Sequence, residues 1–469
     1  MRAYLKETAI PKFMERVNDL GDLELEDALV SLFISDQQIR TKEDAFIQGV
    51  LEELHINLDI ETLIYIFEAL LEDHNVVEHG IVFTPKYIAS YICREIWREV
   101  SQWSADIKVI DPGCGCGIFL IAAILYISKT YDISVRQIIE NNIYGIDLNA
   151  DNVRRCKKIL KAFAAWNGEA VSEESIHIIC ADSLKNAWNK LFGVPHFDYI
   201  VGNPPYVNIH DMNKDTAAFL KKNFQSTKTG VYNIFYAFIE HAMKFLSGDG
   251  MLGYIVPNNF LTIKSAKDLR IFLRKEACVR KIVDFGENMV FKPVRTYNCI
   301  IFLNHKLNEK MQYYVMEKTE DVETLLNHME FTEIPRNQLD KDGWKLVDSR
   351  TYWNLRKIES QEKPIKEFVR TGIATLRDSV YIVDKDEEGY YKELDGKRYE
   401  IDCEMVKTLY KVPELKDETD INKVSRHIIF PYTVRDEGVE LISENQLKHK
   451  YEKTYKYLLA SKCELDRRD

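Results

Sequence analysis

The chain has 469 residues and 46% of them are hydrophobic, so it is long enough to bury a large core in two or three domains. The first 80 residues carry 18 acidic and 6 basic side chains, which leaves a net charge of +1 for residues 81–469 and permits a basic groove there. No uncharged apolar run reaches about 18 residues and the N-terminus lacks the apolar core of a signal peptide, so we expect a soluble, cytoplasmic protein rather than a membrane or secreted one.

Nine cysteines occur at irregular spacing, which fits neither a disulfide framework nor paired zinc ligands. Cys114 and Cys116 lie close together, but no further ligand follows them at a spacing that suits a metal. We therefore expect reduced thiols and no metal site.

Residues 1–75 have the apolar spacing of helices, as in residues 28–34 and 63–71, and hardly any glycine. Nothing in them resembles a nuclease site of spaced carboxylates and a lysine. We predict an acidic helical domain that packs against the rest of the chain or against a partner protein.

Thr84 and Pro85 precede an amphipathic helix that we expect to end near residue 100. Threonine is a common helix cap and proline is common in the first turn, so ordinary capping explains the pair. The free N–H groups at a helix start also suit the carboxylate of a bound ligand. Taken alone, the pair favours ordinary capping.

A glycine-rich turn follows a short apolar strand at residues 109–111. Asp111 ends this strand, and Gly113, Gly115 and Gly117 come before a helix that begins near residue 119. Glycine lets the backbone approach a ligand closely, and Asp111 suits either an ammonium group or the ordering of the turn. The turn lacks the Gly-Lys-Ser/Thr ending of a phosphate-binding loop.

Two further predicted strands, at residues 143–147 and 176–182, also end in an acid. Asp147 stands where an open α/β fold places the carboxylate that binds both ribose hydroxyls. Asp182 suits the amino group of an adenine, although either acid taken separately is as consistent with a helix cap. Three strand-terminal acids followed by the loop described next are harder to explain by capping.

The most informative stretch is Asp198–Tyr206, a buried strand that breaks at Gly-Asn-Pro-Pro. Because Pro204 and Pro205 fix the backbone and remove N–H donors, the carbonyl groups of Asn203 and Pro204 can face a ligand as acceptors. Tyr206 adds a flat ring suited to stacking on a nucleobase. Acceptors that hold both N–H groups of an exocyclic amine favour a more tetrahedral, nucleophilic nitrogen, so the loop predicts methyl transfer to such an amine.

Together and in this order, these motifs resemble the gamma-class adenine-N6 DNA methyltransferases of restriction-modification systems. In that class the cofactor elements come first, the catalytic loop second and target recognition last. The resemblance is close over residues 79–305 and loose over residues 360–469. It implies an α/β, Rossmann-like methyltransferase domain at residues 76–305 with S-adenosylmethionine as its cofactor.

The resemblance also implies roles for individual residues. The cofactor would be bound by Thr84, Pro85, Asp111, Gly113, Gly115, Gly117, Asp147 and Asp182. An adenine extruded from the duplex would be received by Asn203, Pro204, Pro205 and Tyr206, with Phe291 as the second ring of an aromatic sandwich. Ser183 follows Asp182 where family members often carry an aromatic that packs on the cofactor adenine, so that contact is open.

The last third of the chain is expected to hold a charged connector at residues 306–360 and the start of a target recognition domain at residues 361–469. By the resemblance, recognition opens at residues 369–377 and 428–432. The implied partner is double-stranded DNA, without a membrane. Relatives usually carry more recognition sequence, so either a missing C-terminal part or a separate specificity subunit would complete the reading of DNA.

Two polar regions allow two interpretations each. Basic side chains between residues 264 and 281 suit either a helix that lies beside DNA or a charged surface helix. We interpret residues 207–230 as a mobile flap, which either contacts phosphates or is simply solvated.

Two other functions remain open at this point. A glutamine-N5 methyltransferase acting on a protein also pairs a small helical domain with Asn-Pro-Pro-Tyr, although that family is much shorter and has no recognition domain. A DNA-binding subunit with a structural cofactor pocket would show the same motifs without catalysis. Cytosine-N4 is also a possible target, because both amines suit the same acceptors.

Overall fold

A computed structural model describes the parts of the chain on which the following sections rest. The described residues are 8–35, 39–70, 84–276, 278–291, 296–319, 321–361, 372–373, 375, 377–410, 424–435 and 438–466. The chain divides into two compact units, Met1–Ser360 and Gln361–Asp469. Among the described residues, no helix has the length and apolar character that crossing a membrane requires.

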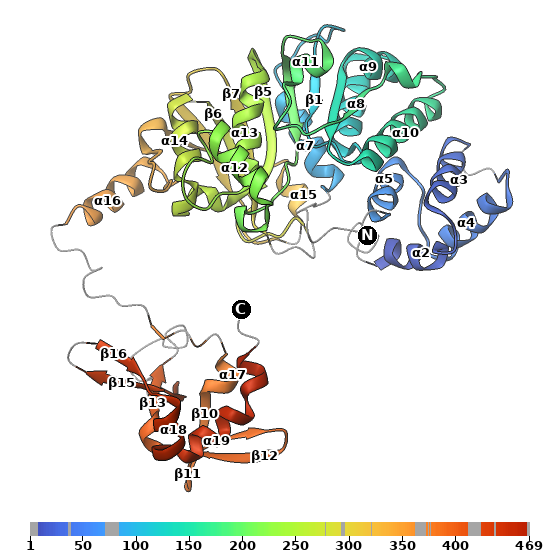
Figure 1. Ribbon diagram of the computed structural model, residues 1–469. Helices are drawn as coiled ribbons and strands as arrows, with labels where there is room; N and C mark the ends of the chain where they lie inside the picture. Colours follow the sequence, from blue (N-terminus) through green and yellow to red (C-terminus); the bar gives the residue numbers. More distant parts are fainter. Residues whose placement is uncertain are drawn as a thin grey trace. The chain divides into compact units, whose positions relative to one another are not determined.

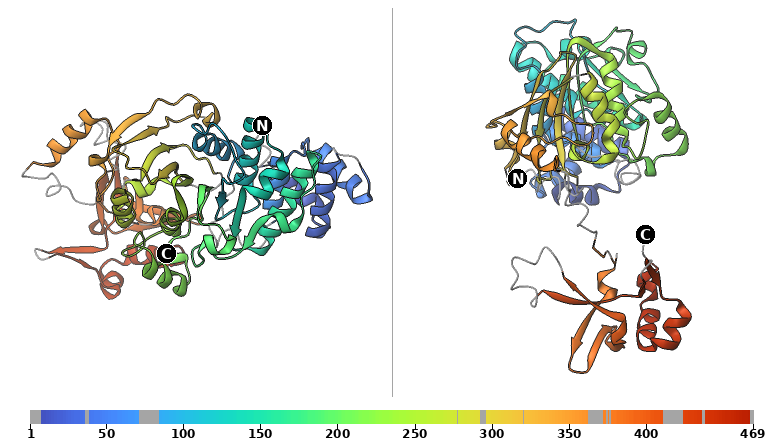
Figure 2. Two further views of the ribbon diagram at one scale, coloured as in Figure 1. Left: turned by 90° about the horizontal axis from the view of Figure 1, so that it is seen from above. Right: turned by 90° about the vertical axis from the view of Figure 1, so that its left-hand side faces the viewer.

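The N-terminal part of the first unit is helical, as the apolar spacing predicts. Its described helices of eight residues or more are α2 (Ile10–Val17), α3 (Asp22–Ile34), α4 (Lys42–Glu53) and α5 (Ile60–Ala69). Thr41 and Asp44 form a capping box at the start of α4, and Asp59 caps α5. Figures 1 and 2 show these helices beside α10 (Ala150–Trp166), against which α3 and α5 pack.

A nine-stranded sheet forms the centre of the first unit. Its spatial order is β3-β2-β1-β4-β5-β7-β6-β8-β9. The strands in chain order are β1 (Val109–Asp111), β2 (Ile143–Asp147), β3 (His177–Cys180), β4 (Phe197–Gly202), β5 (Leu246–Pro257), β6 (Val279–Asp284), β7 (Asn298–Asn304), β8 (Lys310–Val315) and β9 (Thr332–Pro335). The strands from β3 to β5 are parallel, whereas β7 runs antiparallel to both its neighbours.

The sheet is covered on both faces. In β7, Ile300 and Phe302 belong to one apolar core, whereas Ile301 and Leu303 belong to the other. Alternation of this kind places successive side chains on opposite faces, so both faces are buried. The main covering helices, which Figure 1 labels, are α7 (Lys86–Ile96), α8 (Ile118–Tyr131), α9 (Val135–Asn141), α10, α13 (Ile234–Phe245) and α14 (Lys267–Glu276).

The residues expected to form a connector contribute to the same sheet. β8 pairs with β6 and β9 pairs with β8, so residues 306–360 extend the sheet rather than only linking two domains. A short helix, α15 (Val322–Leu325), precedes β9, and α16 (Ser349–Glu359) ends the first unit. Together these elements confirm the mixed α/β fold that the resemblance implied, with a large central sheet.

The second unit has its own small core around Val383, Ile401, Ile429 and Tyr457. A five-stranded antiparallel sheet has the order β12-β11-β10-β14-β13. The elements of the whole second unit are α17 (Asp378–Tyr381), β10 (Ile382–Asp386), β11 (Gly389–Leu394), β12 (Lys397–Ile401), β13 (Val406–Tyr410), β14 (Ser425–Ile429), β15 (Tyr432–Arg435), β16 (Gly438–Leu441), α18 (Glu444–Lys450), α19 (Glu452–Ala460) and α20 (Lys462–Leu465). Most of the predicted recognition segment 369–377 lies outside the described residues.

Candidate functional site

A cleft of about 950 Å³ opens at the carboxyl ends of β1 to β4. The chain places β2 on one side of β1 and β4 on the other, and open α/β sheets bind ligands where the strand order reverses in this way. Nine predicted site residues line the cleft: Thr84, Asp111, Gly113, Gly115, Asp147, Asp182, Asn203, Pro204 and Pro205. The glycine turn and the Asn-Pro-Pro loop therefore face a common space. Pro85, Gly117, Tyr206 and Phe291 are not among the described residues that line it.

The glycine turn is shaped by positive backbone angles. Gly115 has φ +51° and its N–H group donates to Asp147 Oδ2 at 2.9 Å, which joins the turn to the end of β2. Gly117 has φ +96°, and a Cβ atom there would lie 2.9 Å from Cys156 Sγ. The structure thus places Gly117 behind the cleft, where it permits α8 to start close to α10.

Asp111 lies beneath both loops. It is 1% exposed, and its Oδ1 atom accepts a hydrogen bond from the Gly113 N–H at 3.0 Å. Gly202 has φ +152°, and a Cβ atom on it would approach Asp111 Oδ1 to 2.6 Å. Burial raises the pKa of Asp111 to about 8, and the neighbouring charge of Asp147 adds to the rise. Of the two roles considered for Asp111, the contacts favour ordering of the turn.

Three hydrogen bonds hold the carboxylate of Asp147. Its Oδ1 atom accepts from the Asn149 N–H at 2.9 Å and from Asn152 Nδ2 at 3.0 Å, and Oδ2 accepts from Gly115. Burial raises the pKa of Asp147, while these hydrogen bonds oppose the rise. The carboxylate is therefore oriented before any ligand arrives.

Asp182 both lines the cleft and caps a turn. Its Oδ1 atom accepts from the N–H groups of Leu184 at 3.0 Å and Lys185 at 3.2 Å, and its Oδ2 atom lies 3.0 Å from Lys185 Nζ. Sequence reasoning offered capping and ligand binding as alternatives. The structure shows the capping contacts and also exposes the carboxylate to the cleft.

Ser183 is buried and links two loops by hydrogen bonds, so it offers no surface on which a base could stack. Its hydroxyl donates to the carbonyl of Pro112 in the glycine turn, and its own carbonyl accepts from Trp188 Nε1 at 2.8 Å. Aromatic rings reach the cleft from other elements, namely Phe119 of α8, Phe238 of α13 and Phe219 of α12 (Lys214–Asn223).

Thr84 does not cap α7, so the capping interpretation of this residue is wrong. Pro85 occupies the N-cap position and no side chain caps the helix. The Thr84 hydroxyl instead accepts a hydrogen bond from Asn203 Nδ2 at 3.1 Å. This bond joins the start of α7 to the loop after β4, a link that local sequence patterns do not reveal.

Tyr206 and Phe291 come together, but they pack on each other. Their ring centroids are 6.3 Å apart with an interplanar angle of 61°, and Phe291 is 2% exposed. The Tyr206 hydroxyl donates to the carbonyl of Ile255 and accepts from Asn298 Nδ2, both at 3.2 Å. In this arrangement the rings leave no parallel gap for a base.

Several basic residues between 264 and 281 have internal roles. Arg270 is fully buried and donates to the carbonyl groups of Phe260, Ile263 and Lys341. Lys281 is also buried and pairs with a glutamate of α7. The polar segment 207–230 contains α12, so it is partly helical instead of being an open loop throughout.

Glu68 is one of the cleft residues that sequence reasoning missed. It lies in α5 of the N-terminal helices, is 4% exposed, and lines the cleft with the glycine turn. The feature of the sequence that could have indicated this position was a single acidic residue inside the apolar run 63–71. Among the described residues, no group of three or more metal-ligating side chains occurs.

The central region of the chain is similar to known proteins. Residues 141–291 match the family of the Eco57I restriction-modification methylase. The chain is 27% identical over 465 residues to the type II restriction enzyme and methyltransferase RM.Eco57I of Escherichia coli, an alignment that covers 84% of this chain and 46% of that protein. It is 26% identical over 355 residues to the type II methyltransferase M.BstVI of Geobacillus stearothermophilus, covering 67% of this chain and 62% of the relative.

Solved structures show a similar fold. The cryoEM structure of the DrdV–DNA complex aligns with 74% of this chain and 41% of that chain, at a TM-score of 0.53 and 18% sequence identity. By the two alignments with curated relatives, the present chain spans about half the length of RM.Eco57I and 62% of M.BstVI.

Proposed function

We propose that the protein transfers a methyl group from S-adenosylmethionine to adenine N6 in double-stranded DNA, a proposal that the match of residues 141–291 to the family of the Eco57I restriction-modification methylase supports. The observation that carries this proposal is the shared cleft, where the glycine turn after β1 faces the Asn203-Pro204-Pro205 loop after β4. Two loops from neighbouring strands can hold a donor and an acceptor in line, and such positioning supplies most of the rate in a direct displacement. The chain would act within a restriction-modification or defence system.

The groups in the cleft fit the proposed cofactor. Asp147 is oriented at the end of β2, where it would receive the ribose hydroxyls, and Asp182 at the end of β3 would receive the adenine amino group. The turn at Gly113 and Gly115 has open space where side chains would otherwise stand, which permits close approach of the methionine moiety. When bound, the cofactor supplies a methyl group on a sulfonium.

The acceptor loop would hold the target base. The side-chain carbonyl oxygen of Asn203 and the backbone carbonyl oxygen of Pro204 would accept the two N–H groups of the exocyclic amine. Thr84 orients the Asn203 side chain by accepting a hydrogen bond from its Nδ2 atom. Tyr206 and Phe291 would stack on the base after their rings separate. Loss of the amine proton after transfer requires no strong base within the loop.

The proposal is tested by transfer of labelled methyl groups to DNA. We expect Asn203→Ala to lower the transfer rate by on the order of 100-fold, as when one group that stabilises developing charge is removed. S-adenosylhomocysteine should still bind, because the cofactor side is intact. Undiminished transfer by Asn203→Ala would refute the role of this loop.

The methylated base identifies the substrate. Digestion of the product to nucleosides and mass spectrometry separate N6-methyladenine from N4-methylcytosine. The assay should include any specificity subunit encoded beside this chain, since a partner could complete DNA recognition. Methyl label on protein instead of DNA would favour the glutamine methyltransferase alternative.

A further inference from the structure

The ring of Tyr206 is fixed at its hydroxyl by two strands of the central sheet. The hydroxyl donates to the Ile255 carbonyl of β5 and accepts from Asn298 Nδ2 of β7, and both bonds measure 3.2 Å. Because a carbonyl can only accept, the hydroxyl proton is used at Ile255 and Asn298 contributes its NH₂ group. Burial raises the pKa of the Tyr206 hydroxyl, so the group stays protonated and serves as donor and acceptor together.

Asn298 offers its hydrogen bond from a rigid position. It is the first residue of β7, is fully buried, and stands opposite Pro257 of β5 in the antiparallel pair. Its backbone carbonyl accepts a hydrogen bond from the Phe285 N–H at 3.1 Å, directly after β6. A side chain on a strand that is paired on both sides keeps its place better than one on a loop. The backbone that carries this amide is therefore fixed.

The other half of the Asn298 amide does not stabilise the strand. Among the described residues, no group forms a hydrogen bond with Asn298 Oδ1, although this atom is buried. The residues that follow in β7 are Cys299 and four apolar residues, all of them buried. A buried amide with one unpaired polar atom contributes little to stability compared with an apolar side chain of the same shape. Stability alone therefore does not explain an asparagine here.

The apolar neighbours of Tyr206 do not set the direction of its ring. Phe235 of α13 and Phe291 both pack edge-on against it, at centroid distances of 6.2 Å and 6.3 Å. Apolar packing is largely non-directional, whereas a hydrogen bond requires a defined distance and angle. The two bonds at the hydroxyl therefore determine where the ring points.

Resting on the proposed function, we propose that Asn298 is a positioning residue that holds Tyr206 as the fixed side of the gap for the extruded base. The amide acts through the ring and does not contact the base. A ring that is held in place before DNA binds loses less freedom on stacking, and it aligns the target amine with the acceptors of Asn203 and Pro204. When the two rings separate, the movement then falls to Phe291.

The experiment is a double-mutant cycle read as the rate of methyl transfer to unmethylated DNA, with the full chain and any specificity subunit. Asn298→Leu keeps the number of side-chain heavy atoms but cannot donate to Tyr206. We expect it to lower the rate at saturating S-adenosylmethionine by roughly 5-fold, the worth of one hydrogen bond, with an unchanged KM for the cofactor.

The second variant of the cycle is Tyr206→Phe, which keeps the ring and removes the hydroxyl. It should lower the rate by a similar factor. When Asn298→Leu is added to Tyr206→Phe, we expect no further loss, because the group on which the amide acts is already absent. Asn298→Ala, which cannot overfill the site, repeats the cycle, and thermal unfolding verifies that each variant is folded.

A matched control lies at the opposite end of the same strand. Asn304 is the last residue of β7, is 3% exposed, and accepts a hydrogen bond from Asn308 Nδ2 at 2.9 Å through its Oδ1 atom. Asn304→Leu should transfer methyl groups as wild type does, because this asparagine bonds to the loop that follows β7 and not to Tyr206.

Two results would overturn the inference while the proposed function stands. One is an equal loss from Asn298→Leu with and without the Tyr206 hydroxyl, which a merely structural role predicts. The other is wild-type transfer by both Asn298→Leu and Asn298→Ala. Absence of transfer by wild type with every partner present refutes the proposed function itself.

Discussion

The half of the cleft formed by β1 and β2 is held by hydrogen bonds between its own residues, whereas the loop after β4 continues into an aromatic ring, Tyr206, that packs on Phe291 outside the cleft lining. Asp147 already accepts three hydrogen bonds, one of them from the glycine turn. Tyr206 and Phe291 instead pack on each other and must separate before a base can lie between them. Under the proposed function, this difference corresponds to a preorganised cofactor half and a base half that changes shape on binding.

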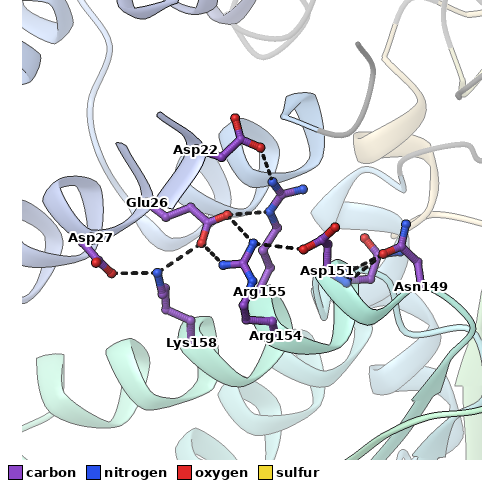
Figure 3. A network of polar contacts seen from close by, with 9 residues as sticks. Asp22, Glu26, Asp27, Asn149, Asp151, Arg154, Arg155 and Lys158 are labelled. Atoms are coloured by element: carbon purple, nitrogen blue, oxygen red, sulfur yellow. Dashed lines mark hydrogen bonds and ion pairs between the residues drawn. The ribbon is translucent and has the colours of Figure 1, made fainter. Parts of the chain in front are cut away.

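The largest expected effect concerns the support of the cofactor half. Glu26 of α3 is fully buried and pairs with three basic residues of α10, the helix that follows β2, as Figure 3 shows. Burial would raise the pKa of Glu26, but hydrogen bonds from Arg154, Arg155 and Lys158 outweigh burial and lower the pKa below its usual range. Glu26→Gln removes the buried carboxylate that three basic side chains share and leaves buried Arg155 with the exposed carboxylate of Asp22, so we expect a loss of about 3 kcal/mol in the free energy of unfolding at neutral pH. Urea unfolding measures this loss.

The pH dependence of Glu26→Gln has a definite sign. Because the folded pKa of Glu26 is depressed, its contribution is present above its unfolded pKa and disappears as pH falls through the folded value. The destabilisation should therefore shrink in acid. Glu173→Gln is the control, since its pair with Lys161 of α10 is exposed and contributes about 1 kcal/mol or less. Equal losses in the two variants would mean that the buried network does not anchor the helical domain.

A substitution at the boundary of the two halves should affect methyl transfer and cofactor binding to different extents. In Gly202→Ala the new Cβ atom would meet Asp111 Oδ1 at 2.6 Å, so the acceptor loop must shift. We expect methyl transfer to fall by on the order of 100-fold, as follows from a misplacement of about 1 Å. Binding of S-adenosylhomocysteine should fall much less.

Gly248 provides the control for this prediction, because a Cβ atom there meets nothing within 4 Å. Gly248→Ala should keep wild-type transfer and binding. If Gly202→Ala lost cofactor binding and transfer to the same extent, the two halves would not be separable as we describe.

The smallest expected change, when it is measured per pH unit, is the change in stability that Asp111 confers. Its folded pKa is about 8, so between about pH 4 and 8 the folded state holds a proton that the unfolded state has released. Stability should therefore fall as pH rises in this range, by about 1.4 kcal/mol per pH unit. Asp111→Asn, which resembles the protonated acid, should remove this contribution to the slope of urea midpoints against pH. An unchanged slope would show that Asp111 ionises normally.

Much of the site follows from the order of strands and loops. Asp111, Asp147 and Asp182 each end or follow an apolar strand, and parallel strands bring their carboxyl ends to one edge. The Asn203-Pro204 loop could be placed there for the same reason. Local pattern and topology were sufficient for these residues.

Contacts between distant segments could not be predicted. Thr84 meets Asn203 across the fold, and Glu68 enters the cleft from a helix whose pattern indicates only packing. Gly117 has the spacing of a cofactor residue, but the nearby Cys156 explains its lack of a side chain. Arg270 appears as a surface base in the sequence and is fully buried among carbonyl groups. Each depends on tertiary packing, which periodicity does not encode.

The position of Asp111 beside Gly202 has a thermodynamic consequence. One carboxyl group accepts a hydrogen bond from the glycine turn and lies close to the backbone that leads into the acceptor loop, so we expect a large displacement of one loop to alter the energy of the other. Linkage then requires reciprocity: the factor by which methyl donor changes the affinity for an extruded base equals the factor by which that base changes the affinity for donor. A base that strengthens donor binding would therefore itself be bound more tightly by the protein that already holds donor.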